Sequence, residues 1–459
     1  MAGSAGRAQN GSVDPDRARQ YPFLPSLGGG LPVARTEGSF LVLADGRRIL
    51  DAAGGAVVAS IGHGRKEVAE VAARTLAEVS YVVPPFATEE RVRLVERLRA
   101  SWLPPGITRC VFASGGSEAI DLAVRVARQH FVSKGEPARW KVIGRELSYH
   151  GTTLSGLDVG GHPKRRKGME PWLHELPKAP ACYPLRCGMC RSAGRCTLAC
   201  ADAIEDAIQR AGPETVAAFI FEPVGGSTAG ALTSPPGYLA RVAEICRRHG
   251  ILSIADEVMS GFGRTGARFA VDHDGFVPDL LVSGKGLASG YAPIVGVFAR
   301  QEVVAPIAAQ GDEVMFYTYA AHPAACAVAD KVLEIMEREA LVARAASMGE
   351  VLRERLVAAL GAHPHVAEIR GKGLLQAVEL VRDRTTLESF AVDDRFTATV
   401  VAIGLANGVF FYPAGAGAAQ DAIVLGPPFT VSEAELDLLV TGLVKSIDGA
   451  AAHIAARRS

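Results

Sequence analysis

The sequence predicts an α/β protein in which helices cover a mainly parallel β-sheet, with a smaller α+β domain beside it. Two observations support this prediction. Short apolar runs without polar alternation recur from Arg109 onward, which indicates strands buried on both faces of a sheet. Helical stretches separate these runs, as they do in parallel sheets. The expected strands are Arg109–Ala113, Val142–Gly144, Ala217–Phe221, Ile251–Ala255, Leu280–Ser283 and Val295–Ala299, and the expected helices include Ser117–Val132, Asp202–Arg210 and Tyr238–Arg248.

The two ends of the chain predict the smaller domain. Helices follow His322, then strands to Leu425 with a helix at 393–407 among them, and a closing helix from Ser432. A hairpin turn at 44–46 predicts N-terminal strands that join this domain. The expected divisions are a flexible segment at 1–30, the N-terminal part of the small domain at 31–75, the large domain at 76–325 and the C-terminal part of the small domain at 326–459.

The composition favours small-molecule partners. The chain has 459 residues, and 49 Lys and Arg balance 49 Asp and Glu to a formal net charge of +0. This balance gives no electrostatic reason to expect nucleic acid or an anionic membrane as partner. No run of 18 apolar residues lacks charges, and the Gly/Ala/Ser-rich start lacks the apolar region of a signal peptide. We therefore expect a cytoplasmic protein that binds small molecules or a second copy of itself.

A glycine-rich segment follows the first strand of the expected sheet. It reads ASGGSEA at 113–119, so Ser114, Gly116 and Ser117 lie where the strand gives way to a helix. Glycines let the backbone approach a ligand closely, and N–H groups at a helix N-terminus attract anions. The segment predicts a phosphate cradle, although such a helix start is more often a simple cap. It is not a Walker loop, because no Gly-Lys-Ser/Thr follows.

Two further strands end in residues that carry chemistry. One ends in adjacent carboxylates, Asp256 and Glu257, and another leads into Gly284-Lys285-Gly286. Ligands of open α/β sheets bind beyond the carboxyl ends of the strands. A lysine buried there has a lowered pKa and can form a Schiff base, and a carboxylate can keep a pyridine nitrogen protonated. A solvated ion pair and a surface turn would explain each part alone, but together with the cradle they predict a pyridoxal 5'-phosphate site.

These residues resemble the class III aminotransferases of fold type I, specifically the ω-aminotransferase branch. The similar blocks are IADEVMSGFGRTG from Ile254, SGKGLASGYAPI from Ser283, SGGSEA, YHG at Tyr149, EPV at Glu222, TYAAHP at Thr318 and RGKGL at Arg370. The resemblance implies a large domain with a seven-stranded sheet and a smaller α+β domain. It also implies a homodimer that moves an amino group from an amine or ω-amino donor to a keto acid or aldehyde in two half-reactions. The same fold also serves aminomutases, epimerases and decarboxylases. A metal-bearing interaction module without catalysis is a competing interpretation of another class.

The resemblance assigns roles to individual residues. Lys285 would hold pyridoxal 5'-phosphate as a Schiff base and shuttle the proton, and Asp256 would pair with the pyridine nitrogen. Tyr149 and Val258 would lie on the two ring faces. The remaining assignments are Gly116, Ser117 and Ser114 near the phosphate, Thr318 reaching the phosphate of the neighbouring subunit, and Glu222 and His150 near the cofactor.

Three positions depart from the family pattern. Members that act on amino acids such as ornithine carry an arginine at the place of Val424 and a glutamate at the place of Ser227. Both are missing here, which is physically consistent because an unpaired buried charge is costly. Met259 stands where many relatives have a glutamine that hydrogen-bonds the cofactor. A keto acid still needs an anion-binding group, and Arg264, Arg268 and Arg370 are available.

A cysteine-rich segment also has two interpretations. Cys187-x-x-Cys190 with Cys196 and Cys200 has the spacing of a structural zinc site, with Cys182 nearby. A packed loop near the active-site mouth is the alternative, and we expect it rather than a metal. The basic run Lys164-Arg165-Arg166-Lys167 precedes this segment and is typical of a solvated face.

Overall fold

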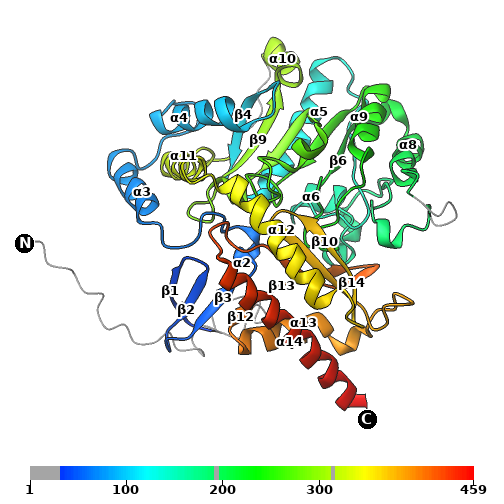
Figure 1. Ribbon diagram of the computed structural model, residues 1–459. Helices are drawn as coiled ribbons and strands as arrows, with labels where there is room; N and C mark the ends of the chain where they lie inside the picture. The colour runs from blue at the N-terminus through cyan, green and yellow to red at the C-terminus, as the bar shows by residue number, and fades with distance from the viewer. Residues whose placement is uncertain (1–30, 191–195, 312–315, 459) are drawn as a thin grey trace, which may run out of the picture.

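The computed structural model describes residues 31–190, 196–311 and 316–458 of the chain. The flexible segment predicted at 1–30 lies outside the described residues. Figure 1 shows a large sheet with its helices in the upper part of the molecule. The smaller part, built from both ends of the chain, lies below it.

The large sheet has the strand order β4-β9-β8-β7-β6-β5. Neighbours from β5 to β8 are parallel, and β9 is antiparallel to both β8 and β4. Every residue of β6, β7 and β8 is buried, as expected for strands covered on both faces. The α/β fold with a mainly parallel sheet is confirmed. The strands are β4 (Ile107–Ala113), β5 (Lys141–Ile143), β6 (Val216–Phe221), β7 (Leu252–Asp256), β8 (Leu280–Ser283) and β9 (Val295–Arg300).

The predicted number of seven strands is wrong for the described part of the chain, where this sheet has six. Ala179 occupies the seventh place as an isolated parallel bridge to Arg145. Its N–H donates to the Gly144 carbonyl at 3.0 Å, and its carbonyl accepts from the Glu146 N–H at 2.8 Å. Pro180 follows at once, and because proline has no N–H it cannot extend the ladder.

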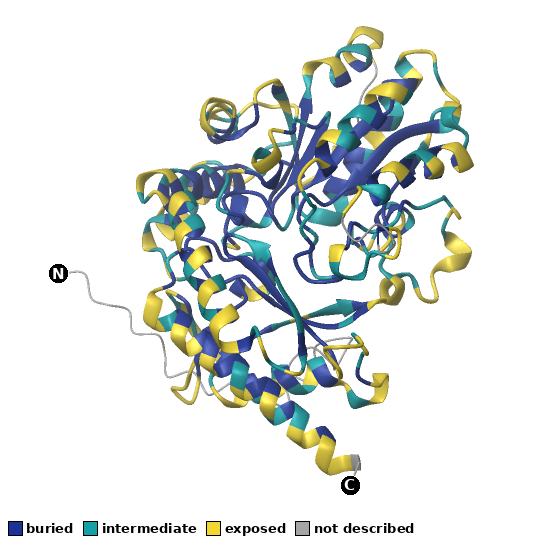
Figure 2. Ribbon diagram, turned by 45° about the vertical axis from the view of Figure 1, so that its right-hand side comes forward, coloured by how far each residue is buried: buried dark blue, intermediate teal, exposed yellow. Residues whose placement is uncertain are grey.

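Two layers of helices cover the sheet. Along β6, Ala218 and Ile220 belong to the apolar cluster under α5, whereas Phe219 and Phe221 belong to the cluster under α8 and α9. This alternation places the two clusters on opposite faces of the sheet. Figure 2 shows the buried strands between the helices. The helices of this part are α3 (Lys66–Glu78), α4 (Glu89–Arg97), α5 (Gly116–Ser133), α6 (Leu154–Val159), α7 (Pro163–Arg166), α8 (Ala199–Ala211), α9 (Tyr238–His249), α10 (Gln301–Gln310) and α11 (Pro323–Arg338).

Two four-stranded sheets form the smaller part, in the orders β1-β2-β3-β12 and β10-β11-β14-β13. The first sheet joins the two ends of the chain, because β3 pairs with β12. The strands are β1 (Val33–Glu37), β2 (Phe40–Leu43), β3 (Arg48–Asp51), β10 (Val366–Lys372), β11 (Leu375–Leu380), β12 (Val409–Phe410), β13 (Tyr412–Ala416) and β14 (Ala419–Leu425). The helices are α2 (Gly54–Val57), α12 (Leu341–Leu360), α13 (Phe396–Ala406) and α14 (Glu433–Arg458). The exact domain boundaries stay a prediction, and the one proposed at 325/326 falls inside α11.

Helix α14 is, within the described residues, the one helix long and apolar enough by composition to cross a membrane. Such a composition is also typical of a core helix. Leu436, Leu439, Leu443 and Ile447 are fully buried, and α14 packs against α12 and α13. We therefore interpret α14 as a core helix of the smaller part.

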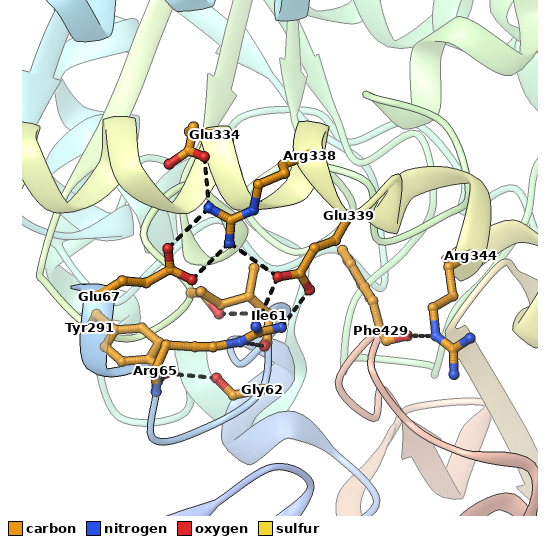
Figure 3. Close-up of polar contacts among 11 residues, drawn as sticks. Ile61, Gly62, Arg65, Glu67, Tyr291, Glu334, Arg338, Glu339, Arg344 and Phe429 are labelled. Atoms are coloured by element: carbon orange, nitrogen blue, oxygen red, sulfur yellow. Dashed lines mark hydrogen bonds and ion pairs between the residues drawn. The ribbon is translucent and has the colours of Figure 1, made fainter. Parts of the chain in front are cut away.

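A polar network ties the end of α11 to the loop that follows Lys285 (Figure 3). The Arg65 guanidinium donates to Glu339 at 2.9 and 2.7 Å. The Arg65 N–H donates to the Tyr291 hydroxyl at 2.8 Å, and that hydroxyl donates to the Gly62 carbonyl at 2.9 Å. Ser289 strengthens the same junction, since its hydroxyl accepts N–H bonds from Ser60 and Ile61 at 2.8 and 3.0 Å. The loop beyond Lys285 is therefore anchored to the N-terminal segment.

Candidate active site

A cavity of about 610 Å³ lies at the carboxyl ends of β6, β7 and β8. Glu222 directly follows β6, Asp256 ends β7, and Lys285 follows β8. Neighbouring parallel strands end at one edge of a sheet, so the topology alone brings these three side chains together. All predicted site residues except Thr318 line the cavity: Ser114, Gly116, Ser117, Tyr149, His150, Glu222, Asp256, Val258 and Lys285.

Asp256 and His150 form a buried pair at the floor of the cavity. His150 Nδ1 lies 2.7 Å from Asp256 Oδ2, and both side chains are almost fully buried. Asp256 Oδ1 accepts the Val258 N–H at 3.0 Å, which fixes the carboxylate in its plane. His150 Nε2 is buried without a hydrogen-bond partner within the described protein. This geometry makes His150 a positioning residue for Asp256.

Lys285 carries an amine that is buried in this cavity. Burial lowers its pKa to about 8, against the opposing attraction of Asp256 and Glu222. The backbone of Lys285 has φ +37°, which is unfavourable for a residue with a side chain. The preceding position leaves no room for a side chain, since a Cβ on Gly284 would lie 2.6 Å from Val295 Cγ2. The structure thus holds Lys285 in a strained position where a sizeable fraction of the amine is neutral near pH 8.

Glu222 holds the wall of the cavity in place. Its Oε1 accepts the Tyr149 N–H at 3.0 Å, and its Oε2 accepts the Gly226 N–H at 2.6 Å. Burial raises the pKa of this carboxyl group. Glu222 therefore connects the end of β6 to the segment that carries Tyr149 and to the turn beneath Met259, which also lines the cavity.

The glycine-rich segment forms the N-terminus of α5 at the cavity. The N-cap residue is Gly115, so no side chain caps this helix. A Cβ on Gly116 would lie 3.3 Å from Val258 Cγ1, so a larger residue would crowd the wall. Ser117 Oγ accepts the Thr152 N–H at 3.0 Å. An uncapped helix N-terminus with glycines suits a phosphate group.

Thr318 is exposed and does not line this cavity. Its carbonyl accepts the Tyr81 hydroxyl at 3.1 Å, and the rings of Tyr81 and Tyr319 meet edge to face at 6.2 Å. Phe86, Phe316 and Tyr319 around it are also exposed. Thr318 therefore lies outside the cavity of its own chain.

Some cavity residues escaped the sequence interpretation. Ala56 and Val58 line the cavity from the N-terminal side, and Tyr412 lines it from β13. Buried Asp51 shapes this N-terminal wall, because its two carboxylate oxygens accept the Gly55 N–H at 2.9 and 2.7 Å. Gly54 and Gly55, three and four residues after Asp51, were the one signal in the sequence of a turn that faces a ligand.

The three arginines considered for anion binding serve the fold, and none of them lines the cavity. Fully buried Arg264 donates to the carbonyls of Pro427 and Ala59 at 2.6 and 3.1 Å. Arg370 is paired with Glu379 and donates to the Gly230 carbonyl at 2.7 Å. Arg268 is exposed and donates to the Ser101 carbonyl at 2.7 Å.

The cysteine-rich segment gives no metal site in the described residues. No group of three or more His, Cys, Asp or Glu side chains there is arranged to hold a metal ion. Residues 191–195 of the segment lie outside the described part. Cys182 and Cys200 are buried, and the Cys190 thiol lies 3.4 Å from the Thr197 hydroxyl.

Comparison with known proteins decides the family. Residues 28–447 match the family described as Aminotransferase class-III. The chain belongs to this family. This aminotransferase is 36% identical to an uncharacterized aminotransferase of Schizosaccharomyces pombe, over 96% of this chain and 98% of the relative. It is 32% identical to the putrescine–pyruvate aminotransferase of Pseudomonas aeruginosa, over 92% of each chain. The omega transaminase of Pseudomonas jessenii in complex with PMP has a TM-score of 0.87 and 30% identity, covering 96% of this chain and 99% of that one.

The enzyme is a pyridoxal 5'-phosphate-dependent aminotransferase of fold type I. It transfers an amino group from an amine donor to a keto-acid or aldehyde acceptor, and these relatives give no support to a mutase, epimerase or decarboxylase. The residues present fit the cofactor. The uncapped α5 N-terminus suits its phosphate, Asp256 suits its ring nitrogen, and the buried amine of Lys285 suits its aldehyde.

The role of His150 is testable by substitution. His150→Phe keeps a ring in the space but removes the donor to Asp256. We expect kcat/KM to fall about 10- to 100-fold, because the buried carboxylate loses a charge-assisted hydrogen bond worth roughly 1.5–3 kcal/mol. We also expect the visible absorbance band of the bound cofactor to shift.

The matched control is His130→Phe. His130 is also buried, and its Nδ1 hydrogen-bonds the Val303 carbonyl at 2.9 Å, outside the cavity. That variant should lose thermal stability but keep the absorbance band of the wild type. An unchanged band and unchanged kcat/KM in His150→Phe would show that His150 only fills space.

Proposed function

We propose that Lys285 Nζ holds the aldehyde carbon of pyridoxal 5'-phosphate as a Schiff base and moves the proton during transfer. The observation that carries this proposal is the convergence of Lys285 with the buried carboxylates of Asp256 and Glu222 in one cavity. The neutral form of a lysine is the nucleophile, and the lowered pKa of Lys285, about 8, makes that form available. Within the described residues, Lys285 is also the only cationic side chain that lines the cavity.

The other residues hold and orient the reacting groups. The bound cofactor supplies an electron sink for the carbon that carries the amine. Asp256 accepts the ring N–H, and His150 keeps the carboxylate oriented by its hydrogen bond of 2.7 Å. Tyr149 and Val258 flank the ring, Glu222 holds Tyr149 through its N–H, and Ser114, Gly116 and Ser117 surround the phosphate. When it is not bonded to the cofactor, the free amine of Lys285 would take the proton from the donor carbon and return it later in the cycle.

The wall beyond these residues favours donors without an α-carboxylate. Val224 and Met259 line the cavity and pack with buried Val424 in one apolar cluster, although Val424 does not itself line the cavity. A carboxylate would lose its hydration here without gaining a partner. The proposed donors are therefore amines and ω-amino compounds, with a keto acid as acceptor, as the name of the putrescine–pyruvate relative suggests.

Lys285→Ala tests the chemistry directly. The variant should lose the visible cofactor band and at least about 10⁴-fold in turnover, because both the attachment point and the proton carrier are gone. Absorbance spectra and single-turnover assays with an amine donor measure this. In the wild type, covalent loading measured by reductive trapping should be half-maximal near pH 8, since burial lowers the pKa of Lys285 to about 8.

Turnover that survives in Lys285→Ala would overturn the assignment of this lysine. Tyr317→Phe serves as the matched control. The Tyr317 hydroxyl bonds the Glu118 carbonyl at 3.2 Å outside the cavity, so its loss should leave the cofactor band in place.

A donor panel tests the substrate class. With pyruvate and 2-oxoglutarate as acceptors, kcat/KM for simple primary amines and diamines should exceed that for ornithine, whose α-carboxylate would meet the apolar wall, by roughly tenfold or more, the scale of one missing charge-assisted contact. The double variant Val424→Arg with Ser227→Glu should narrow this difference. Equal kcat/KM values for all donors in the wild type would contradict the proposed role of the apolar wall.

We propose further that the enzyme is a homodimer in which each cavity receives Thr318 of the partner subunit. Exposed Thr318 sits among the exposed aromatic residues Tyr81, Phe86, Phe316 and Tyr319, and such a group on a surface favours an interface. A two-fold axis is the usual symmetry. The eight unpaired cysteines, all described, support a cytoplasmic location.

Subunit complementation tests this arrangement. Lys285→Ala alone is inactive, and Thr318→Asp should be impaired because a carboxylate repels the cofactor phosphate. In a mixed dimer, one cavity then combines both defects, while the other has Lys285 and the partner subunit's intact Thr318. Mixed dimers should therefore regain activity that neither parent shows. No recovery in proven heterodimers would mean that Thr318 does not act across the interface.

A further inference from the structure

The cavity does not itself contain a group that could bind a substrate carboxylate. Among the described residues, no arginine lines it, and Lys285 is taken by the cofactor. Asp256 and Glu222 lie at its inner end, so a carboxylate there would meet like charges at low dielectric. If the acceptor is a keto acid, as proposed above, its carbonyl carbon must reach Lys285 while its carboxylate points outward, toward the rim.

The basic run at 164–167 lies at that rim. Lys164 Nζ donates to the Gly415 carbonyl at 3.1 Å, and the Gly415 N–H donates to the carbonyl of Ser227, which lines the cavity, at 3.1 Å. Arg166 Nη1 donates to the carbonyls of Asp158 and Gly160 at the end of α6, at 3.3 and 3.2 Å. These contacts fix the backbone on both sides of Arg165. The basic run, which was predicted to be a solvated face, thus also lies against the edge of the cavity.

Arg165 is the member of this run that faces the cavity wall. Its Cζ lies 5.9 Å from the ring centroid of Tyr149, which lines the cavity. Within the described residues no hydrogen bond or ion pair holds its guanidinium, and the residue is exposed. Arg165 therefore offers free donors beside the ring of Tyr149.

Among the residues that the structure describes, no carboxylate forms an ion pair with Arg165. His162 meets the Tyr149 ring edge to face at 6.2 Å, and burial lowers its pKa to about 4, so it is uncharged at neutral pH. The wall positions nearby are Ser227 and Tyr412, which carry hydroxyl groups rather than carboxylates. A planar guanidinium on an aromatic ring is preorganised for a carboxylate.

We propose that Arg165 binds the carboxylate of the keto-acid acceptor at the mouth of the cavity. The inference rests on the proposed amine-to-keto-acid transfer and adds the residue that distinguishes acceptors. It also explains how a cavity without an internal arginine accepts an apolar amine in one half-reaction and an anion in the other. The amine leaves Arg165 in solvent, and the keto acid meets it at the mouth.

The test compares acceptors with and without a carboxylate. In Arg165→Ala, KM for pyruvate should rise about tenfold with kcat little changed, because a uniform binding contact at an exposed rim is lost. KM for acetaldehyde, which lacks the carboxylate, should stay the same. Arg165→Lys should restore part of the pyruvate affinity. Raising the salt concentration should raise KM for pyruvate in the wild type more than in Arg165→Ala.

The matched control is Lys167→Ala, which removes one positive charge from the same run, whereas the ring contact with Tyr149 is made by Arg165. It should leave KM for pyruvate within about twofold of the wild type. An equal rise of KM for pyruvate in both variants would mean that the basic run acts only through its summed positive charge, which would contradict a specific role of Arg165. An unchanged KM in Arg165→Ala would overturn the proposal. Pyruvate-dependent turnover by the wild type remains the separate test of the proposed function, so the two failures are distinguishable.

Discussion

The structure depends on one electrostatic constraint, the burial of a lysine beside two carboxylates at the edge of the sheet. Lowering the pKa of Lys285 to about 8 corresponds to about 3 kcal/mol against its charged form. Asp256 and Glu222 offset part of this desolvation. Each carboxylate is satisfied by its own donors, from His150 Nδ1 and the Val258 N–H or from the Tyr149 and Gly226 N–H groups. The cavity is therefore polar where chemistry occurs and rigid around it.

The sheet topology explains how this constraint is met. Glu222, Asp256 and Lys285 follow three neighbouring parallel strands, so no long loop has to bring them together. The loop after Lys285 is then tied down by Ser289 and Tyr291 to the N-terminal segment, which also supplies Ala56 and Val58 to the cavity. The cavity of this aminotransferase thus needs both ends of the chain, and the stability of the small part directly affects the position of Lys285.

The sequence was informative where chemistry sits at strand ends. Apolar runs located β4 to β9, and the positions of Lys285 and Asp256 at the sheet edge followed from where those runs stop. The prediction of a seventh strand was wrong because the family resemblance does not reveal that Pro180 ends the ladder of hydrogen bonds after Ala179. Tyr412 could not be predicted, since it reaches the cavity through the packing of β13, a contact between distant segments. Arg165 lay in a run whose charges alone indicate only solvent exposure.

The replacement of a charged pair by uncharged residues determines where the cavity tolerates a substrate carboxylate. Where ornithine-type relatives carry arginine and glutamate, this chain has Val424 behind the cavity wall and Ser227 in it, and neither is charged. Val224 presents the apolar cluster of Val424 to the cavity, so a carboxylate directed there would be desolvated without compensation. Inside the cavity the negative charges of Asp256 and Glu222 also repel anions. The wall and the floor together leave the rim as the direction in which a substrate carboxylate is tolerated, and the rim is where Arg165 lies against Tyr149.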